Sequence, residues 1–186
     1  MGRDFATLAK TSTNSCDLVR TDTRAFADDH LERLDAVSHI IETGQRGEIA
    51  AAIEHVRRSA SLSLTHGDPG SGNYLDHPSG GTILDWETAH VAPFGLDAGR
   101  GAFIALLDLG HTGISCELHD AFIDGYRSNL TDSARLDTQT LHAATLVAAL
   151  QFIQGRHTRP LRPDRTAQMA IDTTTKYLAR PGRRTP

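Results

Sequence analysis

Three oxygen-bearing side chains, Asp68, Asn73 and Asp85, occur close together near the middle of the sequence. Two carboxylates and an amide oxygen suit a hard cation such as Mg²⁺, which takes few protein ligands together with substrate phosphates. A carboxylate that stays off the metal could accept a proton from a hydroxyl nucleophile. The residue types therefore indicate a magnesium site with a general base beside it.

Local sequence patterns predict how these side chains are brought together. Residues 73–75 and 82–84 are short strand-like segments, and the turn-rich stretch 76–81 separates them. A hairpin here would return the chain so that Asn73 and Asp85 lie at the same end. The glycines at positions 67, 70 and 72 allow a tight loop before it.

The rest of the chain is predicted to be mostly helical, which makes the fold class α+β with one small central β-hairpin. Polar residues dominate positions 1–27, which we expect to be a loosely ordered lead-in. The main domain is expected over 28–180, followed by a basic tail over 181–186. Apolar periodicity predicts helices beginning near residue 28, after 47 and after 115, and over 102–109, 138–154 and 164–178.

Composition limits the classes of partner. The chain has 186 residues, 39% of them hydrophobic, and a formal net charge of −4, which gives no general attraction to nucleic acid or anionic membranes. The apolar run 102–107 is too short to span a bilayer. Two widely separated cysteines fit a reducing compartment. We therefore expect a cytoplasmic protein that binds neither nucleic acid nor membrane.

Two motifs carry a family resemblance. His66-Gly67-Asp68 with Asn73 five residues later, and Asp85-Trp86-Glu87 after the hairpin, resemble the aminoglycoside phosphotransferase family and its relatives, which include choline kinases. The resemblance implies the C-terminal lobe of a protein-kinase-like fold. Unlike typical protein kinases, this chain has no Arg after the His and no Phe-Gly after the second Asp.

The resemblance also implies roles for individual residues. Asp68 would be the catalytic carboxylate that deprotonates the acceptor hydroxyl, while Asn73 and Asp85 would hold Mg²⁺ against the phosphates of ATP. His66 would brace the loop, and Asp97 would be structural. The acceptor would be an aminoglycoside or a related small molecule with a hydroxyl group.

One part of the family pattern has no counterpart in the sequence. Upstream of His66 the only glycines are at positions 2, 44 and 47, and the only lysine is Lys10, so no glycine-rich nucleotide loop or strand lysine can be built. The resemblance therefore covers about residues 28–180, and we expect the N-terminal β-lobe to be absent. The chain would then be a catalytic lobe that is either truncated from a longer product or completed by a separate N-lobe chain, and alone it would have weak or undetectable activity. Apolar side chains that the missing lobe would cover lead us to expect self-association.

Two other functions stay open. The chain could be a catalytically inactive C-lobe remnant that binds a small molecule. It could also be a metal-dependent hydrolase that uses His66, Asp68 and Asp85 with His77 or His90, although no zinc-type histidine spacing supports this. Acidic residues that would attract a cationic acceptor, or simply interact with solvent, are Asp120, Asp124, Asp132 and Asp137.

Overall fold

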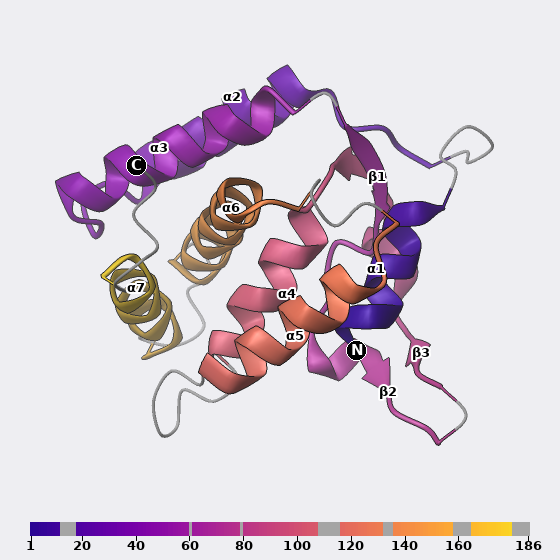
Figure 1. Cartoon of the computed structure of the whole chain (residues 1–186). Helices are drawn as coiled ribbons and strands as arrows, with labels where there is room; N and C mark the ends of the chain where they lie inside the picture. The colour runs from indigo at the N-terminus through magenta and orange to yellow at the C-terminus, as the bar shows by residue number, and fades with distance from the viewer. Residues whose placement is uncertain are drawn as a thin grey trace.

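A computed structural model describes residues 1–11, 18–59, 61–78, 80–107, 116–131, 136–157 and 165–179. The described helices are α1 (Gly2–Lys10), α2 (Thr23–Ala36), α3 (Thr43–Arg57), α4 (Leu96–Leu107), α5 (Cys116–Ser128), α6 (Thr138–His157) and α7 (Arg165–Leu178) (Figure 1). The strands are β1 (Leu62–Thr65), β2 (Tyr74–Leu75), β3 (Thr82–Ile83) and β4 (His90–Pro93). None of the described helices is long and apolar enough to cross a membrane. The predicted fold class, mostly helical with a small hairpin, is confirmed.

Helix α4 lies between the other helices and is buried along most of its length (Figure 1). Two glycines permit this close packing. A Cβ on Gly99 would lie 2.3 Å from the backbone carbon of Ala144 in α6, and one on Gly101 would lie 2.2 Å from the ring of Phe122 in α5. One core cluster therefore joins α2, α3, α4, α6 and α7, and a second joins α1, α4 and α5.

Two separate two-stranded sheets flank this helical body. Strands β2 and β3 form the predicted antiparallel hairpin, with Tyr74 opposite Ile83, and the hairpin extends away from the helices (Figure 1). Strand β1 pairs with β4 in antiparallel register, with Leu64 opposite Val91. Strand β4 was not predicted from the sequence. The β1–β4 pair holds the loop after β1 against the start of α4.

The expectation that residues 1–27 form a loosely ordered lead-in is wrong for most of the described part of this segment. Helix α1 occupies residues 2–10, and its Phe5 side chain is fully buried. Helix α2 begins at Thr23, because the Asp22 carboxylate accepts hydrogen bonds from the backbone N–H groups of the first turn. The predicted basic tail at 181–186 and residue 115, after which a helix was expected to begin, lie outside the described residues.

Candidate functional site

The loop that contains His66 and Asp68 is fixed by a buried carboxylate at the start of α4. Asp97 Oδ2 accepts a hydrogen bond of 2.6 Å from the backbone N–H of His66, and Oδ1 accepts one of 3.0 Å from Gly67. Burial raises the pKa of Asp97, and these two backbone hydrogen bonds oppose the rise. The geometry agrees with the structural role inferred for Asp97.

His66 is held on both of its ring nitrogens. Nε2 donates to the carbonyl oxygen of Leu84 at 2.7 Å, and Nδ1 accepts from the backbone N–H of Asp68 at 3.3 Å. The buried ring also makes edge contacts with Phe5 of α1 and with Trp86. His66 therefore joins the loop, the hairpin and α1, as expected for a bracing residue, and neither nitrogen is left to bind a metal.

Gly67 is required by the path of the loop. Its φ of 84° lies in the left-handed region, and a Cβ there would lie 2.6 Å from the carbonyl oxygen of Thr88. The Thr88 hydroxyl in turn donates to the carbonyl oxygen of His66 at 2.8 Å. The residues after the hairpin and the loop before it thus pack directly on each other.

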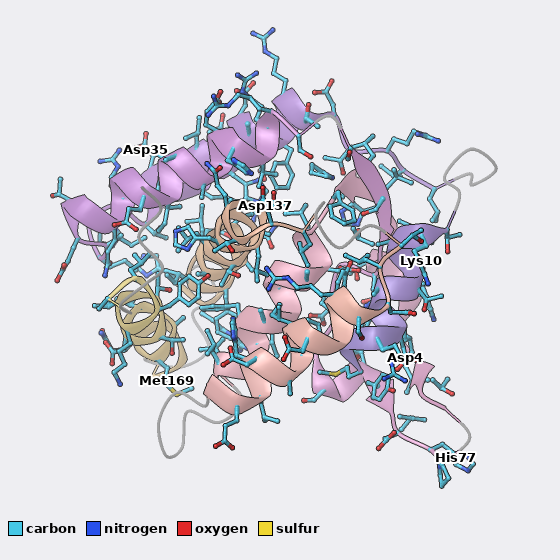
Figure 2. The ribbon with its side chains drawn as sticks, viewed as in Figure 1. Asp4, Lys10, Asp35, His77, Asp137 and Met169 are labelled. Carbon is cyan, nitrogen blue, oxygen red and sulfur yellow. The ribbon has the colours of Figure 1, made fainter. Side chains whose placement is uncertain are left out.

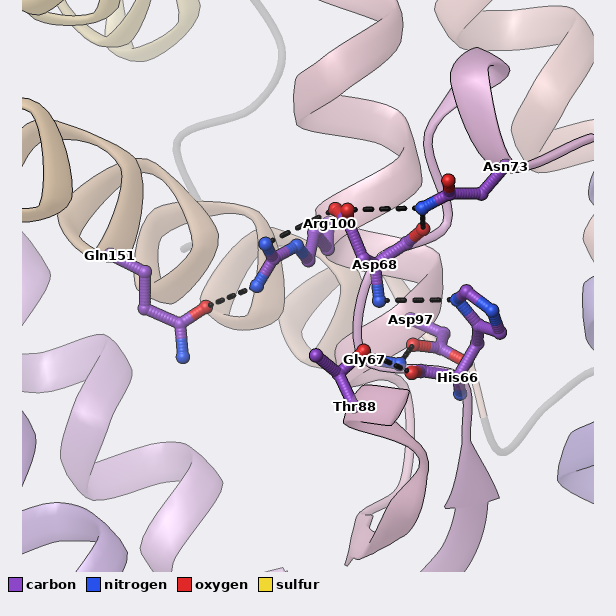
Figure 3. A network of polar contacts seen from close by, with 8 residues as sticks. All are labelled: His66, Gly67, Asp68, Asn73, Thr88, Asp97, Arg100 and Gln151. Atoms are coloured by element: carbon purple, nitrogen blue, oxygen red, sulfur yellow. Dashed lines mark hydrogen bonds and ion pairs between the residues drawn. The ribbon is translucent and has the colours of Figure 1, made fainter. Parts of the chain in front are cut away.

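Asp68 presents its carboxylate between two partners, as Figure 3 shows. Oδ2 accepts a hydrogen bond of 3.0 Å from Asn73 Nδ2, which also bonds the carbonyl oxygen of Asp68. Oδ1 accepts one of 3.2 Å from Arg100 Nη2 on α4. The side chain is 43% exposed, so the carboxylate is oriented and still accessible to a substrate.

The predicted convergence of Asn73 and Asp85 is supported by the hairpin's register. The backbone N–H of Leu84 donates to the carbonyl oxygen of Asn73 at 2.9 Å, which places Asp85 one residue beyond this pair. Asp85 has a φ of 60°, an unusual value for a residue other than glycine. Its exposed side chain makes no hydrogen bond or ion pair to any other described residue.

These two residues provide suitable oxygen donors for Mg²⁺. The Asn73 amide nitrogen is engaged with Asp68, which leaves the amide oxygen on the side away from it (Figure 3). With the Asp85 carboxylate it would offer two hard ligands to Mg²⁺, whose typical shell is otherwise filled by phosphates and water. A strained backbone angle at the exposed Asp85 carboxylate is also typical of functional sites.

The geometry does not support the hydrolase alternative. Within the described ranges, no three His, Cys, Asp or Glu side chains come together as a metal site. His77 lies at the tip of the hairpin, away from the helices (Figure 2). His90 Nδ1 bonds the carbonyl oxygen of Thr88 at 2.7 Å.

An open cavity of about 640 Å³ adjoins Asp68. Arg100 of α4 and Gln151 of α6 line it beside Asp68, and Arg100 Nη1 donates to Gln151 Oε1 at 3.3 Å (Figure 3). Gln151 Nε2 lies 2.9 Å from Nε2 of the buried His30, whose Nδ1 bonds the carbonyl oxygen of Phe26 at 2.7 Å. Sequence analysis missed Arg100, Gln151 and His30, because no local motif marks them.

Several residues singled out in the sequence lie elsewhere. Asp120 and Asp124 line a different cavity, and the Asp137 carboxylate caps the start of α6 through the backbone N–H of Thr140. Asp132 lies outside the described residues. Lys10 is on α1, where its amino group lies 3.4 Å from Asn129 Oδ1, so it does not resemble a strand lysine at a nucleotide.

The sequence can be compared with families of known proteins. A model described as "Phosphotransferase enzyme family" matches residues 1–138, a segment that includes His66, Asp68, Asn73, Asp85 and Asp97. The chain belongs to the phosphotransferase enzyme family. The match extends over residues 1–27, in agreement with the ordered α1 found there. No curated protein matches the chain.

Solved structures share the fold of this phosphotransferase family member. A choline/ethanolamine kinase family protein from Mesorhizobium loti superposes with a TM-score of 0.63 and 19% identity, over 97% of this chain and 60% of that one. Choline kinase from Cryptosporidium parvum Iowa II gives 0.59 and 13%, over 95% and 62%. A glucosamine kinase gives 0.58 and 18%, over 95% and 50%. The chain thus spans between half and about three fifths of the length of these kinases.

Proposed function

We propose that this protein transfers the γ-phosphate of ATP to a hydroxyl group of a small molecule. One observation carries the proposal: the half-exposed Asp68 carboxylate is held between Asn73 on the hairpin side and Arg100 on the cavity side. A base oriented in this way, with magnesium-type ligands on one side and a small-molecule cavity on the other, suits phosphoryl transfer.

In this reaction, Asp68 accepts the proton of the acceptor hydroxyl. The acceptor oxygen bonds to the γ-phosphorus while the bond from that phosphorus to the β,γ-bridging oxygen breaks, and ADP leaves. Asn73 and Asp85 would hold Mg²⁺, which neutralises charge on the phosphates when bound. Asn73 would also keep the Asp68 carboxylate in place through the 3.0 Å hydrogen bond. His66 and Asp97 would fix the loop.

The nucleotide-covering groups are proposed to lie outside the residues of this chain, either in a longer product of which it is a part or in a separate chain that completes it. The hairpin that carries Asn73 and Asp85 exposes Leu75 (56%), Leu84 (37%) and Trp86 (45%). This apolar surface, next to the proposed magnesium ligands, suits a covering partner. We place the reaction in the cytoplasm and propose no nucleic-acid or membrane partner, since the net charge of −4 favours neither.

A single-turnover assay tests the proposed function. Purified protein in excess over γ-³²P-labelled ATP and Mg²⁺ is incubated with hydroxyl acceptors, beginning with aminoglycosides because the sequence motifs resemble their kinases. Slow transfer to at least one acceptor is expected, and Asp68→Asn should abolish it. Transfer that is unchanged in Asp68→Asn would contradict the assignment of Asp68.

One observation favours the second candidate function, a small-molecule-binding protein without catalysis. Arg100 pairs with one oxygen of the Asp68 carboxylate and Asn73 bonds the other, so both oxygens already accept from donors within the protein. Acceptor binding without any Asp68-dependent transfer, even when a full-length kinase N-lobe is added in trans, would support this candidate over the enzyme.

A further inference from the structure

The charged side chains that line the cavity beside Asp68 are mostly positive, although the net charge of the protein is negative. Its charged lining consists of three arginines, Arg33 of α2, Arg100 of α4 and Arg156 of α6, and among the described lining residues Asp68 is the single acid. A volume of about 640 Å³ lies within the usual range for small-molecule sites. The charge of the lining therefore determines which acceptors, anionic, neutral or cationic, this cavity would favour.

The internal ion pairs leave part of this positive charge uncompensated. Arg100 pairs with Asp68, and Arg33 Nε lies 2.6 Å from the carboxylate of Asp29, which is not part of the lining. Arg33 also donates to Gln154 Oε1 at 3.0 Å. Arg156 is 5.1 Å from the ring centre of Phe152 and has no carboxylate within ion-pair distance among the described residues.

The remaining lining suits an organic molecule with polar groups. Phe152 and Ile104 provide apolar surface, with the buried Phe103 packed against Phe152 at 6.0 Å between ring centres. Gln151 supplies an amide that Arg100 and His30 hold in place. Guanidinium groups bind carboxylates and phosphates through two parallel hydrogen bonds, whereas they repel an ammonium group.

We infer that the phosphoryl acceptor is a hydroxyl compound carrying a carboxylate or phosphate group, with its hydroxyl at Asp68 and its anionic group at Arg33 and Arg156. This inference rests on the proposed function, because it identifies the cavity's ligand as the acceptor. It also sets this protein apart from a kinase for cationic aminoglycosides, for which the lining provides no acidic side chain besides Asp68.

Four sugars with the same ring and different charge test the inference. Glucose, glucosamine, glucuronate and glucose 6-phosphate are titrated into ¹⁵N-labelled protein without nucleotide, and amide shifts report binding. Glucuronate or glucose 6-phosphate should bind at least about tenfold more tightly than glucose, and glucosamine more weakly than glucose. The stronger of the two anions shows whether the group recognised is a carboxylate or a phosphate.

Two variants test whether the preference for anionic sugars arises in this cavity. Replacing both Arg33 and Arg156 with Gln should remove the preference for the anionic sugars. Arg58→Gln should preserve it, because Arg58 is an exposed arginine directly after α3 and is not part of the cavity lining. Equal shifts from all four sugars, no shift from either anion up to 50 mM, stronger binding of glucosamine, or a preference that survives the double substitution would overturn the inference.

The design separates this inference from the proposed function. If the protein prefers the anionic sugars but binds no Mg²⁺-ATP, the inferred ligand class of the cavity would stand and the proposed phosphoryl transfer would be contradicted. Mg²⁺-ATP binding together with a preference for glucosamine would support the phosphotransferase and overturn the anionic acceptor.

Discussion

Arg100 Nη2 lies 3.2 Å from Asp68 Oδ1, although 32 residues separate the two in the sequence. The contact links the loop after β1 to α4, and through Gln151 and His30 it continues to α6 and α2. The orientation of the proposed catalytic carboxylate therefore depends on packing between helices that contain no recognisable motif.

Asp68→Asn should lower the rate of phosphoryl transfer by about 10² to 10⁴, because the amide cannot accept the hydroxyl proton. The affinity for Mg²⁺-ATP should change by less than about threefold, since Asn73 and Asp85 are kept. Single-turnover transfer and calorimetric titration measure the two effects. Asp76→Asn, on the exposed hairpin turn, is the matched control and should retain the wild-type rate.

Asp85→Gly should raise the free energy of unfolding by about 0.5 kcal/mol, because glycine adopts the φ of 60° without the steric cost that Asp carries. Asp85→Ala keeps the Cβ and should give no such gain. Urea unfolding monitored by circular dichroism compares the variants. A marked loss of stability in Asp85→Gly would mean that the carboxylate supports the fold rather than a ligand.

Gly67→Ala should lower the free energy of unfolding by roughly 2–4 kcal/mol, since it combines a φ of 84° with a Cβ 2.6 Å from the Thr88 carbonyl oxygen. Gly72→Ala is the control, because a Cβ there meets no atom within 4 Å. Thermal and urea unfolding provide the comparison. Equal stability of the two variants would contradict the described path of the loop.

Stability should fall on mild acidification because of His30. Burial lowers the pKa of His30 below its usual value near 6.5, and protonation would also place an N–H against the Gln151 amide group. The native state thus binds fewer protons than the unfolded state. The stability that neutral His30 contributes is complete above pH 6.5 and is lost as the pH falls below it, by at most about 1.4 kcal/mol per pH unit.

The measurement is the urea midpoint at pH values from 8 to 5. His30→Gln should show a smaller decrease with falling pH than the wild type does. His39→Gln should behave like the wild type, since His39 is exposed on the surface. An unchanged pH dependence in His30→Gln would show that other groups cause the acid sensitivity.

The hairpin and its polar ends could be predicted from the sequence because the signals are local. Short strand-like segments around the turn at 76–81 are enough to place Asn73 and Asp85 at one end. The start of α2 was predicted about five residues too late. The buried face of this helix contains the polar His30, while the apolar Leu31 beside it is 44% exposed.

Long-range contacts explain what the sequence could not predict. Helix α1 is short, and its neighbours in the sequence are polar. Its order comes from Phe5 packing on His66 and from Asp4 accepting a hydrogen bond of 2.6 Å from the Tyr74 hydroxyl. That contact raises the pKa of Tyr74 to about 12. Arg100 and Gln151 join the site in the same way, through the close approach of α4 and α6 at Gly99.

A calorimetric titration with ATP tests most directly whether Asn73 and Asp85 form a magnesium–nucleotide site. It is performed with and without Mg²⁺, on the wild-type protein and on Asp85→Asn, which keeps the side chain's shape and removes its charge. We predict binding by the wild type that requires Mg²⁺ and that Asp85→Asn weakens at least tenfold. Absence of binding at millimolar ATP, or binding that depends on neither Mg²⁺ nor Asp85, would contradict the account.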